Sequence, residues 1–135
     1  MQRANKNGYS LLEVLLVMAM VVSLVALALP SWREQQYTVR RPLAWLQLQH
    51  IALAQSEYKQ QTGNFATSLT QLGVPTQDDA YGYSLQVAEE SHTIQAKVLS
   101  PGPSQGDKTC WQLVWSSMDG AYSLDQLGGR SNGCR

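Results

Sequence analysis

The sequence predicts an α+β fold in which one long N-terminal helix packs on an antiparallel sheet of roughly four strands. Three observations predict it. Residues 11–29 form an apolar run, residues 43–60 have helical spacing, and the chain beyond residue 80 alternates between apolar and polar residues. The 135 residues have room for one domain, and ten basic and ten acidic residues leave no net charge that would draw the chain to nucleic acid.

The apolar run reads LLEVLLVMAMVVSLVALAL and contains one charge, Glu13, and one hydroxyl, Ser23. As a helix it is about 28 Å long, close to the roughly 30 Å hydrocarbon core of a bilayer. A secretory signal peptide has a shorter apolar stretch, followed by a small-residue cleavage site that is missing here. A simple membrane anchor leaves Glu13 unexplained, because an unpaired carboxylate is costly in lipid.

The segment MQRANKNG-YSLLEVLLVMAMVVSLVALALP resembles the class III leader of type IV pilins and type II secretion pseudopilins. The resemblance rests on Gly8 before the apolar run, on Glu13 as the fifth residue after that glycine, and on Pro30 at the end of the run. It implies that prepilin peptidase removes residues 1–8 on the cytoplasmic side. It also implies that the new N-terminal residue, Tyr9, becomes N-methylated.

Cleavage after Gly8 exposes a cationic amine at Tyr9, about one helical turn from Glu13. In a filament, the resemblance implies that Glu13 accepts the Tyr9 amine of a neighbouring subunit, which sets the axial register of the helices. A low dielectric constant around such a pair makes it strongly orienting, even where its net stabilisation is small.

The helix is predicted to have an apolar transmembrane or filament-core part, residues 9–30, and an amphipathic second half, residues 31–62. Pro30 and Pro42 are predicted to kink it, because each removes a backbone donor. The apolar face of the second half is predicted to consist of Ala44, Leu48, Ile51, Ala52 and Tyr58, and the polar positions are Gln47, Gln49, Gln55 and Lys59.

Residues 63–135 are predicted to form a globular head. Its first part is rich in Gly, Asn, Pro and Asp and is expected to be a loop with one helical turn around Ser68–Leu72. Period-two alternation then predicts strands at residues 83–87, 94–98, 111–115 and 121–124. Asp119-Gly120 is a typical hairpin turn between the last two strands.

The head contains two cysteines, Cys110 and Cys134. In an exported protein an even number of cysteines indicates a disulfide. Closing this loop contributes about 3.5 kcal/mol in the chain-entropy model. It would tie the glycine-rich tail LGGRSNGCR, a disulfide-bounded C-terminal loop, to the sheet.

The head is similar to minor pilins of the PilE type in the segments TGNFATSLTQLG, YGYSLQV and HTIQAKVLSPGPSQGDKTC and in its closing cysteine. In those proteins the C-terminal cysteine pair bounds a surface loop. Trp111 after the first cysteine and Arg135 after the second depart from the pattern, which leaves any ligand of the loop open.

No enzymatic activity and no cofactor or metal are predicted, because the sequence has no nucleophile-elbow, zinc-protease, C-x-x-C or phosphate-loop motif. His50 and His92 lie in different elements without metal-ligand spacing. The pairs Asp78-Asp79 and Glu89-Glu90 are predicted to be solvated turn charges.

A nucleic-acid role is weighed separately, because pilins of this superfamily can take part in DNA uptake. Trp111 and Trp115 would offer stacking surfaces beside a cluster of cations near the disulfide loop. Dispersed cations in an uncharged domain are more typical of an ordinary solvated surface. The four cations in question are Lys97, Lys108, Arg130 and Arg135.

The resulting hypothesis is a minor pilin, a structural subunit of a type IV pilus that serves pilus assembly or priming in motility, adhesion or DNA uptake. Its partners would be other pilins, prepilin peptidase and the bacterial inner membrane, with the head in the periplasm before the subunit enters the extracellular pilus. Three alternatives stay open. They are a type II secretion pseudopilin, which often carries a calcium site or lacks the cysteine pair, a DNA-receptor pilin, and an anchored monomer that would need neither Gly8 nor Glu13.

Overall fold

The computed structural model describes residues 10–134, without the side chains of residues 28–31, 33 and 34. The chain divides into two units, Met1–Gln35 and Gln36–Arg135. Each unit is described by itself.

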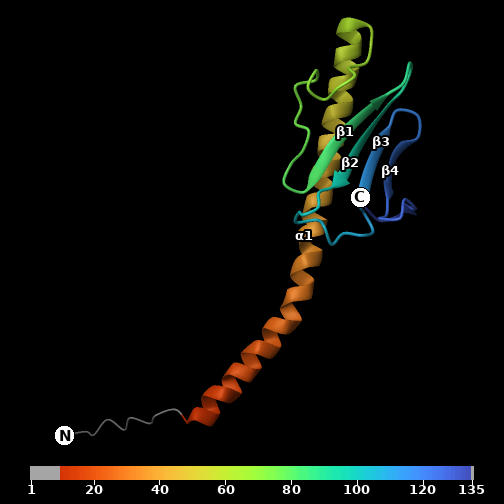
Figure 1. Ribbon diagram of the computed structural model, residues 1–135. Coiled ribbons are helices and arrows are strands. Elements are labelled where there is room, and N and C mark those ends of the chain that lie inside the picture. Colours follow the sequence, from red (N-terminus) through yellow and green to blue (C-terminus); the bar gives the residue numbers. More distant parts are fainter. Residues whose placement is uncertain (1–9, 135) are drawn as a thin grey trace, which may run out of the picture. The chain divides into compact units, whose positions relative to one another are not determined.

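One helix, α1, covers Leu11–Thr62 and so includes residues of both units (Figure 1). It ends at Gly63, whose backbone has a φ of +84° and whose N–H donates to the Lys59 carbonyl. Glycine adopts this left-handed conformation without the strain that a side chain would add. The helix is continuous through Pro30 and Pro42. That either proline bends the helix stays a prediction.

The second unit contains an antiparallel sheet in which the strands pair in chain order (Figure 1). The sequence prediction of an α+β fold with an antiparallel sheet is confirmed. The number of strands is five rather than about four, because two residues of the glycine-rich tail pair with the preceding strand. The strands are β1 (Tyr81–Val87), β2 (His92–Val98), β3 (Gln112–Ser116), β4 (Gly120–Leu124) and β5 (Arg130–Ser131).

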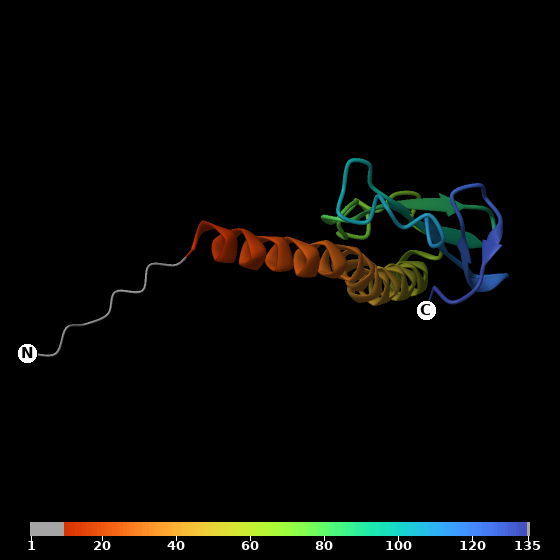
Figure 2. The same cartoon turned by 90° about the horizontal axis from the view of Figure 1, so that it is seen from below.

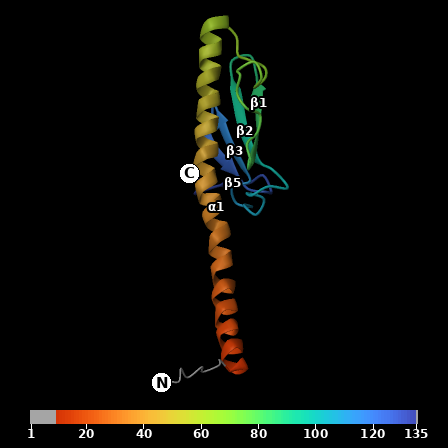
Figure 3. The same ribbon diagram turned by 90° about the vertical axis from the view of Figure 1, so that its left-hand side faces the viewer.

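The part of α1 that belongs to the second unit, from Gln36 onward, lies along one face of the sheet (Figures 2 and 3). Ala44, Leu48 and Ile51 are fully buried, as the apolar stripe of the sequence predicts. They form one core with the side chains of the sheet that face the helix, principally Tyr83, Ile94, Ala96 and Leu113.

The segment of residues 63–80, here called the connecting loop, runs beside β1 (Figure 3). The Thr76 carbonyl accepts the N–H of Tyr83 at 2.7 Å, and Gln77 bridges to Gly82, so the loop covers part of the outer edge of β1. Where the sequence predicts a helical turn around Ser68–Leu72, the structure has a hydrogen-bonded turn and no helix.

Gln55 fastens the connecting loop to α1. The sequence places this residue among the polar positions of the helix, but its side chain is fully buried. Its amide nitrogen donates to the Ala66 carbonyl at 2.8 Å, and its amide oxygen accepts the Ala66 N–H at 3.0 Å. A buried amide is tolerated here because both of its polar atoms are paired.

Candidate functional site

The first unit presents an apolar helical surface. Every described side chain from Leu11 to Leu27 is exposed, and the large apolar ones are between 48% and 79% exposed. The hydroxyl of Ser23 donates to the Ala19 carbonyl at 2.8 Å, so the helix itself satisfies this polar group. An exposed apolar surface of this extent marks a contact with lipid or with another protein.

Within the described residues, no helix combines the length and the apolar character needed to cross a membrane.

Glu13 is the charged residue of this apolar surface and lies in the first turn of α1. Its backbone N–H donates to the Ser10 carbonyl at 2.9 Å, and its side chain is exposed. A carboxylate is favourable in a first turn, where the N–H groups of the helix carry a partial positive charge. The predicted cleavage and methylation residues, Gly8 and Tyr9, lie outside the described residues, so the contact between the Tyr9 amine and Glu13 stays a prediction.

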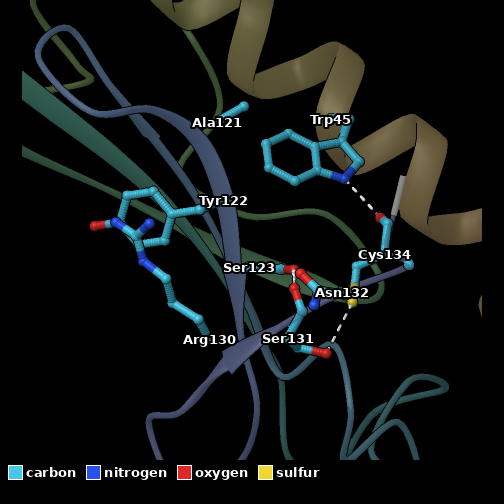
Figure 4. A pocket seen from close by; sticks show the side chains of 9 residues that line it. Trp45, Ala121, Tyr122, Ser123, Arg130, Ser131, Asn132 and Cys134 are labelled. Carbon is cyan, nitrogen blue, oxygen red and sulfur yellow. Dashed lines mark hydrogen bonds between the residues drawn. The ribbon is translucent and has the colours of Figure 1, made fainter.

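The disulfide between Cys110 and Cys134 is confirmed, with an S–S distance of 2.01 Å and a Cα–Cα distance of 5.7 Å. Both cysteines are buried. The carbonyl of Cys134 accepts the indole N–H of Trp45 at 2.7 Å, so the chain after β5 is attached both to the segment before β3 and to α1. Figure 4 shows the hydrogen bond between Trp45 and Cys134.

A pocket of about 450 Å³ lies beside the disulfide. Trp45 and Cys134 stand on one side of it, and Tyr122 stands on the other (Figure 4). The Arg130 guanidinium lies 4.6 Å from the centroid of the Tyr122 ring, a cation–π contact. The remaining lining residues are Ala121, Ser123, Ser131, Asn132 and Gly133.

Two of the four predicted cations come together in a neighbouring pocket of about 540 Å³, which Lys108 and Arg130 both line. Lys97 is exposed on β2, on the sheet face opposite α1, because its neighbours Ala96 and Val98 are buried on the helix side. It stands in the same cross-strand row as Arg130, with Gln112 and Leu124 between them. Arg135 lies outside the described residues.

Trp111 and Trp115 do not form a free stacking surface. Both are partly buried and pack against the core between α1 and the sheet. The ring of Trp115 is also stacked on His92, with ring centroids 5.3 Å apart. The tryptophans therefore stabilise the head, and the aromatic ring in cation–π contact with one of these cations, Arg130, is Tyr122.

Asp78 and Asp79, just before β1, are exposed as predicted, but each also binds a partner within the head that the sequence did not indicate. Asp79 forms an ion pair with Arg40 of α1, and Asp78 accepts the Tyr83 hydroxyl at 2.5 Å and the N–H groups of Ala80 and Tyr81 at 2.7 Å. These two carboxylates therefore contribute to the structure although they are exposed, and Glu89 and Glu90 are exposed in their turn as predicted. Burial, followed by the nearby Asp107, raises the pKa of Tyr81 to about 12.

A second ion pair, between Arg41 of α1 and Asp107, also went unrecognised in the sequence. The two residues are 66 positions apart in the sequence. Nothing in a single sequence indicates that such residues meet.

Among the described residues, no three or more His, Cys, Asp or Glu side chains are grouped so that they could hold a metal ion. Comparison of the chain with protein-family models, with curated proteins and with solved structures gave no match.

Proposed function

We propose that this chain is a minor pilin, a structural subunit that enters a type IV pilus and takes part in its assembly or priming. In this proposal prepilin peptidase cuts after Gly8 and Tyr9 is methylated. The subunit waits in the bacterial inner membrane with its head in the periplasm, and then joins the extracellular fibre.

The observation that carries the proposal is the apolar surface of α1 from Leu11 to Leu27, interrupted by one carboxylate at Glu13. Exposed apolar side chains favour cohesion with other helices or with lipid, but they do not select a register. A single carboxylate does select a register, because in an apolar helix bundle it is stable only opposite a cation. The amine of a neighbouring Tyr9 would supply that cation.

The head supports a structural role. It is held to α1 by the buried core and by the Trp45–Cys134 hydrogen bond, and the disulfide closes its C-terminal loop. We infer that the surface around this loop contacts partner subunits and that the head performs no catalysis.

The test is the N-terminal mass of the protein recovered from the membranes and from the sheared surface fibres of cells that produce it. A chain that starts at methylated Tyr9 and is present in the fibres is the expected result. A chain that starts at Met1 and stays in the membrane would contradict the proposal.

Two matched variants sharpen this test. Glu13→Gln should be cleaved normally but largely lost from the fibre fraction. Glu57→Gln removes an exposed carboxylate from the second half of the same helix and should be incorporated normally. If both variants enter fibres equally well, Glu13 does not set the register.

A type II secretion pseudopilin is the first alternative and would share the same processing. The two functions differ in the fibre that contains the chain. Recovery of the protein in sheared fibres that vanish when the secretion system, rather than the pilus system, is deleted would favour the alternative.

DNA binding by the head is the second alternative, and the shared pocket of Lys108 and Arg130 favours it. Backbone contacts by these cations would make binding weaken steeply as salt is raised. The double change Lys108→Gln and Arg130→Gln should then abolish binding at low salt, whereas Lys59→Gln, a cation at the end of α1, should not. Absence of binding by the unmodified chain at low salt would exclude this role.

A further inference from the structure

His92, the first residue of β2, is buried against two aromatic rings and is only 6% exposed. The centroid of its ring lies 4.7 Å from that of Phe65 and 5.3 Å from that of Trp115. A neutral imidazole fits this apolar slot as a third aromatic ring.

The described surroundings of His92 provide no hydrogen-bond acceptor for a protonated imidazole. Within the described residues, neither Nδ1 nor Nε2 of His92 has a hydrogen-bond partner. Protonation makes both nitrogens donors and adds a charge, and burying an uncompensated charge is strongly unfavourable.

The neighbouring charged group, the Lys59 ammonium, is positive and therefore disfavours protonation of His92. The Lys59 ammonium of α1 lies 4.1 Å from the centroid of the Phe65 ring, the ring that covers His92. Burial, and then the positive charge of Lys59, lower the pKa of His92. Phe65 from the connecting loop, Trp115 from β3 and the cross-strand neighbour Val87 from β1 bring no charge. Glu89 and Glu90 of the preceding turn are exposed.

The slot is also where the connecting loop attaches to the sheet. Phe65 lies near the start of this loop, and the next residue, Ala66, is held by both amide atoms of Gln55. The loop then continues to Thr76, whose carbonyl covers the N–H of Tyr83 at the edge of β1. Loss of the Phe65–His92 contact would thus loosen the end of a segment that shields a sheet edge.

We propose that His92 is a proton-sensitive latch, which when neutral holds the connecting loop against β2 and β3 and when protonated releases Phe65 and the loop. The inference concerns the head alone and does not depend on assembly into a fibre. Opening of the loop would expose the backbone of β1, an edge available to another chain.

The direction of the pH response follows from linkage. A histidine with a lowered pKa in the folded state binds fewer protons there than in the unfolded state. Its stabilising contribution is complete above its ordinary pKa of 6.5 and is lost as the pH falls below that value. The latch is therefore closed at neutral pH and opens on acidification.

The experiment is amide hydrogen exchange of the full chain in detergent, at a series of pH values from neutral to about pH 5, corrected for the pH dependence of the chemical exchange rate. Protection of residues 64–76 should fall at least tenfold as the pH is lowered, while protection of β3 should stay constant. His92→Phe keeps an aromatic ring at this position, and in this variant the protection of residues 64–76 should not fall as the pH is lowered.

Two further variants act as controls. His50→Gln changes the other histidine, which is exposed on α1, and should leave the acid response intact. Lys59→Gln removes the neighbouring positive charge and should reduce the response. Equal loss of protection in the unmodified chain and in His92→Phe would overturn the proposal.

A second measurement keeps the proposal testable if His92→Phe does not fold. The imidazole resonances of the unmodified chain report the titration of His92 directly. A His92 whose pKa is at or above the ordinary histidine value of 6.5, or a loop that stays protected while His92 becomes protonated, would equally overturn the proposal.

Discussion

Arg41 of α1 and Asp107 of the segment before β3 form a two-bonded ion pair, with Nε–Oδ2 at 2.8 Å and Nη2–Oδ1 at 2.9 Å. The Asp107 side chain is only 2% exposed. Its Oδ1 also accepts the N–H of Cys110 at 3.1 Å. One carboxylate therefore connects the helix to the segment that enters the disulfide.

Replacement of Arg41 by Gln should lower the free energy of unfolding by about 3 kcal/mol, because the buried carboxylate of Asp107 loses its counter-ion. Urea denaturation of the full chain in detergent, followed by tryptophan fluorescence, measures the change. Arg40→Gln is the control, because its partner Asp79 is largely exposed, and it should cost less than about 1 kcal/mol. Equal effects of the two changes would contradict this interpretation.

The double change Cys110→Ser and Cys134→Ser should lower the free energy of unfolding by about 2–5 kcal/mol. The disulfide restricts the unfolded chain, and the tail after β4 has few other attachments. The melting temperature with and without reductant is the measurement. Reductant should destabilise the unmodified chain and leave the double variant unchanged, and a response of both would point to another cause.

Gln55→Leu should cost about 2 kcal/mol, because it leaves the N–H and the carbonyl of Ala66 buried without partners. Gln49→Leu makes the same chemical change at an exposed position of α1 and serves as the matched control. Hydrogen exchange at Ala66 is the most direct readout, since its amide should lose protection only in the first variant.

Stability should also fall in alkali. Burial raises the pKa of Tyr81 from 10.0 to about 12 and raises that of Tyr83, where the hydrogen bond to Asp78 adds to the effect. Both phenols thus stay protonated in the fold at pH values where the unfolded chain has lost those protons. Stability present below pH 10 is lost as the pH rises towards about 12. The measurement is the midpoint of denaturation as a function of pH. Tyr81→Phe should make the decline of this midpoint with rising pH less steep, and an unchanged decline would be evidence against a buried phenol at Tyr81.

The parts of the fold that the sequence predicts are those encoded by local periodicity. The apolar run and the stripe of Ala44, Leu48 and Ile51 repeat at helical spacing, and the alternation in β1–β4 repeats every two residues. β5 has only two residues and so cannot show a period. Gln55 reads as a surface residue because its partner, Ala66, becomes available only when the loop folds back.

The site residues divide in the same way. Glu13 stands out in the sequence because it is a charge in an apolar run, and the two cysteines stand out because the sequence contains no others. The pairing of Lys108 with Arg130 in one pocket depends on the turn after β4, where the Gln126 N–H donates to the Lys108 carbonyl. The slot around His92 combines three separate elements, so the sequence shows only an isolated histidine.

The chain order of the sheet has a consequence for how the head folds. Each strand pairs with the strand just before it, so forming the sheet closes only short segments, at little cost in chain entropy. Gln55 and Ala66 are only 11 positions apart, but other contacts of α1 join residues much farther apart, 66 positions for Arg41 and Asp107 and 89 for Trp45 and Cys134. Short-range closures form faster than long-range ones. Although α1 is synthesised first, we therefore expect its contacts with Asp107 and Cys134 to form after the sheet.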